Sequence, residues 1–292
     1  MNILVLGGTK FVGVHLVNYL LAAGHDVTIA TRGRAQDPFA QRVGRIILER
    51  TDEESIRQAL RGRHFDVVYD SQAYSSNEIK YLLDAVTCER YIQVSTASVY
   101  APHFRLAQTE TDFDPTTHPL KWCARDDFGY DEVKRQAECA MFQAYGHVPA
   151  VAVRFPLIVG PDDYTQRLYF YVQHIVQSKA MHIDNLPVQL AFILSDEAGK
   201  FLAWLAQSSF CGSINAANAG TAQLRDIIDY VQNKINTPAI ILPDGGRASF
   251  NGFPDYGLDL QRASGIGYTF PALDAPLYAL LDTYMAQAST EA

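Results

Sequence analysis

Long hydrophobic runs are missing from this sequence, and so is a surplus of basic residues. No apolar stretch approaches the length that a membrane-spanning helix needs, which argues against an integral membrane protein. Lysine and arginine together number 24 against 32 aspartates and glutamates, so the formal net charge at pH 7 is -8. Proteins that bind along nucleic-acid phosphates generally carry a basic face. The charge balance therefore argues against a nucleic-acid partner.

Cysteine is also scarce. The four cysteines, Cys88, Cys123, Cys139 and Cys211, show no CxxC spacing, and no histidines cluster with them. Four are too few for a disulfide framework in 292 residues, so we predict free thiols, no metal site and a reducing, cytoplasmic location. The chain opens on an apolar strand rather than on a charged leader, which predicts no secretory signal.

Strands and helices are expected to alternate over the first 160 residues. The predicted strands are residues 2–6, 26–31, 45–49, 66–70, 90–95 and 150–155, and the predicted helices are residues 11–23, 53–60, 77–86 and 129–145. Such alternation is typical of a parallel sheet with helices on both faces. We therefore predict an α/β fold with a Rossmann-type doubly wound sheet and a dinucleotide-binding domain over residues 1–160.

The alternation weakens beyond residue 160. Helical spacing is found at residues 163–178, 195–208, 224–235 and 276–285, with one short strand at 213–217 and a loop-rich stretch at 242–257. We expect residues 161–292 to form a smaller C-terminal α/β region that binds substrate. Some of its segments should return to pack on the Rossmann domain.

The N-terminal residues MNILVLGGTKFVG carry the most informative pattern. The apolar residues 3–6 lead directly into Gly7 and Gly8, and helical spacing begins at Phe11. This order can hold a dinucleotide pyrophosphate, because glycines permit close approach and the helix N-terminus offers N–H groups and a positive dipole end. The usual fingerprint spaces its first two glycines differently, and the third here is Gly13. A simple tight turn is the alternative, but the βαβ unit that follows favours a cofactor site.

A tyrosine and a lysine four residues apart, Tyr130 and Lys134, form the second pattern. On a helix, this spacing puts both side chains on one face. An ammonium group beside a phenol lowers the pKa of the phenol, which suits an acid/base near neutral pH. The predicted strand 90–95 ends at Ser95 and Thr96, where ligands bind in parallel sheets. An exposed helix face would explain Tyr130 and Lys134 alone, and capping would explain Ser95 and Thr96 alone. The order of the glycine turn, the hydroxyls at the strand end and the Tyr-Lys pair along the chain favours a catalytic site.

In these motifs the chain resembles the extended or atypical short-chain dehydrogenases/reductases that are grouped as NAD-dependent epimerases/dehydratases. The resemblance extends over nearly the whole chain. The glycine turn matches the family form GGTxFxG, and STASVY at residues 95–100 matches the strand-five motif that contains the catalytic threonine, Thr96. Tyr130 and Lys134 match the active-site pair. The family stretch that lines the nicotinamide resembles Arg154, Phe155 and Pro156 together with Gly160 and Pro161. Asp196 and Asn215 match signature positions of the family's substrate region.

The resemblance implies a role for each catalytic residue. Tyr130 would donate or accept the proton of a substrate hydroxyl while hydride passes to or from the nicotinamide. Lys134 would hold the nicotinamide ribose and depress the pKa of the tyrosine, and Thr96 would orient the substrate oxygen. The candidate cofactor-binding residues are Gly7, Gly8, Thr9, Lys10, Phe11, Val12, Gly13, Arg32, Glu49, Ser95, Tyr130, Lys134, Phe155 and Pro156.

The end of the second predicted strand bears on the choice between NAD and NADP. NAD sites usually place an acidic residue there for the ribose hydroxyls, but this chain has Thr31, Arg32 and Arg34. A guanidinium group suits a 2′-phosphate, so we predict NADP in preference to NAD. In the family an acidic residue after the third strand contacts the adenine, and either Glu49 or Asp52 could take that place.

Departures from the family pattern narrow the range of substrates and reactions that we expect. Sugar dehydratases carry an Asp-Glu pair after the catalytic threonine, where this chain has Ala97 and Ser98. Nucleotide-sugar enzymes place an asparagine near Leu157 and an arginine near Gln189, and neither is present. We therefore predict hydride transfer at an alcohol or ketone carbon of a sugar-like or other small substrate, by an epimerase or a reductase.

Two non-enzymatic alternatives stay open. The motif GGTKFVG at residues 7–13, with TRG at residues 31–33, also resembles the chloroplast stem-loop RNA-binding branch of the family. A non-catalytic regulator that binds NADP is a third class. The intact Thr96, Tyr130 and Lys134 favour an enzyme. By resemblance alone, residues 77–86 and 129–145 would form the contact of a homodimer.

Overall fold

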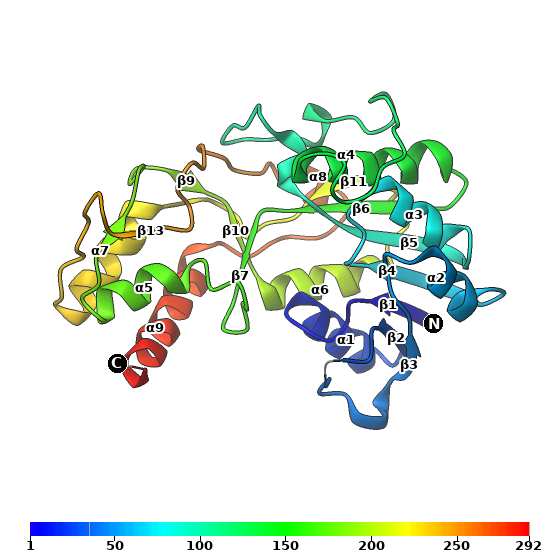
Figure 1. Cartoon of the computed structure of the whole chain (residues 1–292), viewed down its shortest axis with the longest axis horizontal. Helices are drawn as coiled ribbons and strands as arrows, with labels where there is room; N and C mark the ends of the chain where they lie inside the picture. Colours follow the sequence, from blue (N-terminus) through cyan, green and yellow to red (C-terminus); the bar gives the residue numbers. More distant parts are fainter. Residues whose placement is uncertain (35, 292) are drawn as a thin grey trace.

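Seven parallel strands form the central sheet, in the spatial order β3-β2-β1-β4-β5-β6-β11 (Figure 1). A computed structural model describes the chain over residues 1–34 and 36–291. The strands of the sheet are β1 (Asn2–Leu6), β2 (Asp26–Thr31), β3 (Gly44–Ile47), β4 (His64–Asp70), β5 (Thr87–Thr96), β6 (Ala150–Phe155) and β11 (Gly212–Asn215). The order reverses between β1 and β4, which is where Rossmann-type sheets bind ligands. The predicted α/β fold with a doubly wound parallel sheet is confirmed.

Helices cover both faces of this sheet. Helices α1 (Val12–Ala22) and α6 (Ser195–Leu205) pack on one face, and α2 (Glu53–Leu60), α3 (Ser76–Leu83) and α4 (Tyr130–Cys139) pack on the other. Ile3 and Val5 of β1 belong to the first hydrophobic cluster, whereas Leu4 and Leu6 belong to the second. The apolar run of β1 is therefore continuous because both of its faces are buried.

Local signals account for the elements that were predicted most closely. Helix α2 begins after Asp52, whose side chain accepts hydrogen bonds from the backbone N–H groups of Glu54 and Ser55. The helix predicted at residues 129–145 is α-helical only in its first half, α4. Its second half is a π-helical turn, η4 (Ala140–Ala144).

The smaller region lies beside the sheet and has its own hydrophobic core (Figure 1). Its elements are β7 (Leu157–Val159), α5 (Tyr169–Val176), β8 (Met181–His182), β9 (Gln189–Leu190), β10 (Phe192–Leu194), β12 (Ala222–Gln223), α7 (Leu224–Ile235), β13 (Gly246–Arg247) and α9 (Asp274–Thr290). Short 3-10 turns are η1 (Ala40–Arg42), η2 (Ala97–Tyr100) and η3 (Glu110–Asp112). Helix α6, strand β11 and the short helix α8 (Gln261–Gly265) follow residue 160 in the chain but belong to the layers around the central sheet.

The segment before α5 differs from the expected helix over residues 163–178. The helix begins only at Tyr169. The side chain of Asp163 accepts hydrogen bonds from the backbone N–H and the hydroxyl of Thr165, and Gln166 has a φ of 53°. These local hydrogen bonds compete with helical ones, so residues 163–168 form turns.

Candidate functional site

The glycine turn connects β1 to α1 at the carboxyl end of the sheet. Gly7 has a φ of 93°, which favours glycine, and a Cβ atom added to Gly13 would collide with the carbonyl oxygen of Gly7. Phe11 precedes α1 with a φ of 51° and gives the helix no side-chain cap. The turn therefore requires glycine at both positions. It leaves the positive end of the helix dipole beside a cavity that Val12 and Gly13 line.

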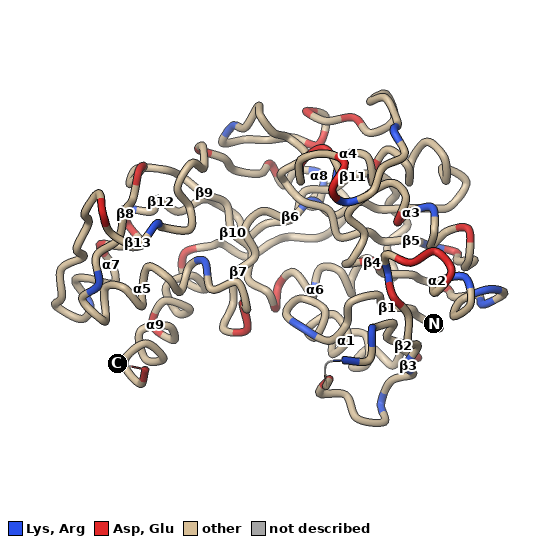
Figure 2. The backbone as a smooth tube through the Cα atoms, viewed as in Figure 1, with Lys and Arg blue, Asp and Glu red and all other residues tan. Residues whose placement is uncertain are grey.

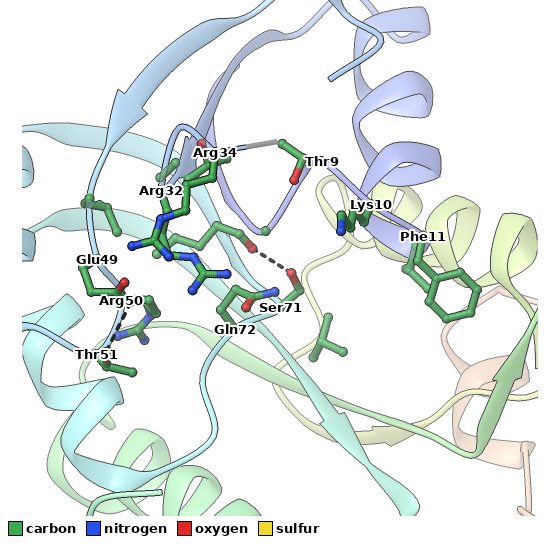
Figure 3. A pocket seen from close by; sticks show the side chains of 18 of the residues that line it. Thr9, Lys10, Phe11, Arg32, Arg34, Glu49, Arg50, Thr51, Ser71 and Gln72 are labelled. Carbon is green, nitrogen blue, oxygen red and sulfur yellow. Dashed lines mark hydrogen bonds between the residues drawn. The ribbon is translucent and has the colours of Figure 1, made fainter. Parts of the chain in front are cut away.

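That cavity has a volume of about 760 Å³. Predicted cofactor residues that line it are Gly7, Thr9, Lys10, Phe11, Val12, Gly13, Arg32 and Glu49. Figure 3 shows Arg32 and Arg34 extending across the cavity on the side of Arg50, with Lys10 on the opposite side. Cationic side chains thus surround the space that lies in front of the glycine turn.

A second cavity, of about 710 Å³, adjoins the first. Both cavities are lined by Phe11, Ser71, Val94, Ile158 and Tyr164, so they form one continuous groove. The predicted residues Ser95, Thr96, Tyr130, Lys134, Phe155 and Pro156 line the second cavity. The groove therefore joins the glycine turn to the predicted catalytic residues.

Tyr130 is the first residue of α4 and lines the second cavity beside Thr96. Thr96 ends β5, and its hydroxyl oxygen accepts a hydrogen bond from the backbone N–H of Ser98 at 3.2 Å. Partial burial raises the pKa of Tyr130, and a hydrogen bond with Thr96 offsets part of that rise. The phenol is therefore protonated at neutral pH.

Lys134 lies one turn after Tyr130, as the spacing predicted, but its ammonium bonds to backbone. Its Nζ donates to the carbonyl oxygens of Ala73 and Val94, at 2.9 and 3.2 Å. Burial lowers the pKa of Lys134 to about 8. The expectation that Lys134 depresses the pKa of Tyr130 stays a prediction, because the net shift in this structure is upward and its largest cause is burial of the phenol.

Several residues of the first cavity were missed by the sequence analysis. Arg50 lines it and forms a buried ion pair with Asp70, with Nε 3.1 Å from Oδ2. Its Nη1 has no hydrogen-bond partner among the described residues. Ser71 and Gln72 directly follow β4 and also line the cavity. The signal that identified Ser95 and Thr96, polar residues at the end of a predicted strand, would have identified these as well.

Gly8 differs from its prediction as a cofactor-binding residue. It lines neither cavity, and a Cβ atom at Gly8 would lie 2.8 Å from Cγ2 of Ile29 and 3.1 Å from Cγ2 of Val17. Gly8 therefore allows the turn to pack closely on β2 and α1. Of the two candidates for the adenine contact, Glu49 lines the cavity, whereas the Asp52 side chain caps α2.

The remaining family positions support the framework of the site. Asn215 accepts a hydrogen bond from the Tyr100 hydroxyl at 2.6 Å and donates one to the backbone of Gln108. Asp196, on α6, accepts from the Tyr19 hydroxyl of α1 at 3.0 Å. Arg154 is fully buried. These side chains connect loops and helices and do not line the groove.

Within residues 1–34 and 36–291, no group of three or more histidine, cysteine, aspartate or glutamate residues is arranged to bind a metal ion. None of the helices described there combines the length and the apolar character that crossing a membrane would require.

Two curated proteins are similar to parts of the chain. The chloroplast stem-loop binding protein of 41 kDa b from Arabidopsis thaliana is 27% identical over 217 residues, which cover 69% of this chain and 54% of that protein. The 2′-dehydrokanamycin reductase of Streptomyces kanamyceticus is 28% identical over 138 residues, which cover 47% of this chain and 38% of that protein. The matches thus span about half the length of these relatives, or less.

Solved structures share the fold over the full chain. The UDP-glucuronic acid 4-epimerase from Bacillus cereus, in complex with UDP-glucuronic acid and NAD, has a TM-score of 0.75 at 20% identity and 100% coverage of both chains. The UDP-glucose 4-epimerase from Thermus thermophilus, in complex with NAD, has a TM-score of 0.71 at 17% identity, with 97% of this chain and 99% of that chain covered. At these identities the likeness establishes the architecture.

The family follows from the sequence match. Residues 3–208, which include the glycine turn, Thr96, Tyr130 and Lys134, match the model of the NAD dependent epimerase/dehydratase family. That range holds most of the central sheet and the greater part of the groove. The chain therefore belongs to the NAD-dependent epimerase/dehydratase family of nicotinamide-dependent enzymes.

Proposed function

We propose that the chain is an NAD(P)-dependent oxidoreductase of epimerase or reductase type. It would act at a secondary alcohol or ketone carbon of a sugar-like or other small substrate. The observation that carries this proposal is the continuous groove, which joins the glycine turn at one end to Thr96, Tyr130 and Lys134 at the other. The Streptomyces relative, which is named as a reductase, supports the same class of reaction.

The residues of the groove fit a nicotinamide dinucleotide. The glycine turn closes on itself so tightly that a Cβ atom at Gly13 has no room, which leaves backbone N–H groups and the helix dipole for a pyrophosphate. Lys134, Phe155 and Pro156 line the second cavity, where the nicotinamide end would lie. When bound, the cofactor supplies the hydride chemistry, while the protein supplies position and electrostatics.

Tyr130 would carry out the proton transfer. Its raised pKa keeps the phenol protonated at neutral pH, so it is suited to donate a proton to a substrate carbonyl oxygen. Thr96, whose hydroxyl is beside the phenol, would orient that oxygen. Lys134 would supply positive charge to the site and hold the nicotinamide ribose. The backbone carbonyl oxygens of Ala73 and Val94 accept hydrogen bonds from its ammonium and so fix its position.

A substitution of Tyr130 tests the catalytic role. Tyr130→Phe should abolish turnover, because the proton donor is lost, and should leave cofactor affinity unchanged. Positioned acid/base groups typically contribute about 10²–10⁴-fold to rate. Tyr81→Phe is a matched control, since Tyr81 on α3 lines neither cavity. Full activity of Tyr130→Phe would contradict the assignment.

The cofactor preference is proposed as NADP over NAD. Arg32 and Arg34 line the first cavity, and neither forms an ion pair within residues 1–34 and 36–291. Free guanidinium groups suit a 2′-phosphate. Fluorescence titration with both cofactors is the test. Arg32→Gln should weaken NADP binding by about tenfold or more and leave NAD binding nearly unchanged. Tighter binding of NAD than NADP by the unmodified protein would refute the preference.

Stem-loop binding is the second candidate, because the Arabidopsis relative is named for it. The net charge of -8 opposes it, and Figure 2 shows acidic and basic residues interspersed along the backbone. We expect no salt-dependent mobility shift with stem-loop RNA. A shift that weakens steeply with salt would favour this candidate over the oxidoreductase.

A cytoplasmic homodimer is part of the proposal. Helices α3 and α4 pack side by side on one face of the sheet and could contact the same helices of a second copy. Light scattering of the purified protein tests the oligomeric state, and a mass equal to one chain would contradict the dimer.

A further inference from the structure

Part of the lining of the second cavity is apolar, and we call this part the apolar wall. It consists of Phe104 from the loop after η2, Leu157 of β7, and Phe253, Pro254 and Tyr256 from the segment between β13 and α8. The hydroxyl of Tyr256 is already engaged with the backbone of Leu157 and Ala191. The apolar wall therefore offers ring surface, with the ring centroids of Phe104 and Tyr256 5.6 Å apart and the ring planes tilted by 52°.

Three charged residues line this cavity, and two of them are already occupied. Asp131 pairs with Arg135 at 3.2 Å. Lys134 donates to two backbone carbonyls. The third charged residue, Arg167, takes part in no ion pair with any residue of the described chain.

Arg167 is held at one atom only. Its Nε donates to the hydroxyl oxygen of Thr165 at 3.1 Å, and that hydroxyl donates to Asp163 at 2.6 Å. Asp163 is itself buried. This relay orients the guanidinium from its Nε side. The Nη1 and Nη2 groups make no hydrogen bond to the residues that the structure describes, which leaves the edge that binds a carboxylate or phosphate in a bidentate manner.

We propose that Arg167 binds an anionic group of the substrate, and that the substrate is a small hydroxy or oxo compound with a carboxylate or phosphate on an apolar, ring-sized body. This inference rests on the proposed oxidoreductase function for the identity of the reacting carbon. The apolar wall receives the body of the substrate, Arg167 receives the anion, and Thr96 with Tyr130 faces the reacting oxygen. The charge of Arg167 also acts on Tyr130 and offsets part of the rise in the pKa of the phenol, which supports their proximity.

The test compares matched probes that differ only in charge. 4-Acetylbenzoate and 4-acetylphenyl phosphate carry a ketone, a ring and an anion, and 4-acetylbenzamide is the neutral counterpart. Binding is measured by calorimetry, with the protein alone and with NADP-saturated protein. At least one anion should bind about tenfold or more tightly than the amide, as one charge-assisted contact provides.

Substitutions assign that preference to one residue. Arg167→Gln should remove the preference for the anions, and Arg167→Lys should retain only part of it, because a lysine lacks the planar fork. Arg247→Gln is the matched control, since Arg247 is exposed on β13 and lines neither cavity. Its preference should equal that of the unmodified protein.

The outcomes separate this inference from the proposed function. If neither anion binds more tightly than the amide, or if Arg167→Gln keeps the preference, the proposal is overturned while NADP binding and the role of Tyr130 can still stand. If NADP fails to bind but the anions keep their Arg167-dependent preference, the anion site stands and the oxidoreductase assignment falls.

Discussion

Arg154 and Glu138 form an ion pair in which both side chains are completely buried, with Nη2 of Arg154 2.6 Å from Oε2 of Glu138. Glu138 lies two turns after Tyr130 on α4, and Arg154 is on β6. Arg154 also donates to the backbone carbonyls of Glu110 and Phe113, at 3.0 Å each. Burial disfavours the charge of Arg154, but Glu138 outweighs it and raises the pKa of the guanidinium. The pair therefore connects helix α4, strand β6 and the segment that contains Glu110 and Phe113.

Removal of one charge from this pair should strongly destabilise the protein. Glu138→Gln leaves the Arg154 guanidinium buried without its counter-charge, which typically costs about 3–5 kcal/mol. Urea unfolding, followed by circular dichroism, measures the change. Glu54→Gln is the control, because the pair of Glu54 with Arg57 is exposed and should contribute little. Equal losses in the two variants would contradict the role of the buried pair.

An alanine at Gly13 should weaken cofactor binding. The added Cβ atom meets the carbonyl oxygen of Gly7, which is backbone, so the turn has to shift. Such overpacking typically costs about 1–3 kcal/mol, and we expect a loss of NADP affinity of about tenfold. Fluorescence titration measures that affinity.

The control for this change is Gly265→Ala. Gly265 is in α8, and a Cβ atom there would have no neighbour within 4 Å. Its cofactor affinity should equal that of the unmodified protein. Unchanged affinity in Gly13→Ala would show that the turn does not approach the cofactor.

The rate of reduction should fall as pH rises past about 8. Burial lowers the pKa of Lys134 to about 8, so its positive charge is lost above that pH, while Tyr130, whose pKa is raised, is still protonated. The loss of rate is therefore assigned to Lys134. Steady-state kcat measured across the alkaline range gives the profile. A variant Lys134→Met should be slow and should lack this descending limb, and a flat profile of the unmodified enzyme would contradict the assignment.

His15 should stabilise the protein more at mildly acidic than at alkaline pH. A hydrogen bond with Asp162 raises the pKa of His15 above 6.5, despite the opposing effect of burial, and Asp196 adds to the rise. The folded state thus binds the proton more tightly than the unfolded chain, so this stabilisation is complete below 6.5 and is lost as pH rises through the folded pKa.

Thermal unfolding of His15→Gln against the unmodified protein tests this relation. His15 and Ser195 lower the pKa of Asp162 against the effect of burial. The Asp162 carboxylate that pairs with His15 is therefore charged throughout the mildly acidic range. The difference in unfolding temperature should be largest below pH 6.5 and should shrink as pH rises. A difference that grows with pH would contradict the ion pair. His147→Gln is a matched control, because His147 forms no ion pair in the described chain.

Local patterns in the sequence predicted several elements well. Strands β1, β2 and β6 and helices α2 and α7 have the bounds that their apolar periodicity and flanking residues indicated. The same patterns could not predict β7, because this strand has only three residues and pairs with β10, which follows more than thirty residues later. The edge of the groove that β7 forms therefore depends on contacts between distant segments.

The sequence by itself determined the glycine turn, the ends of the strands and the four-residue spacing of Tyr130 and Lys134, because each is a property of neighbouring residues. Only the tertiary structure decided how those groups are charged and which are free. It placed the carbonyls of Ala73 and Val94 against Lys134, and it brought Arg167 into the same cavity as the apolar wall. Burial and hydrogen-bond partners arise from segments far apart in the chain, so spacing alone does not reveal them.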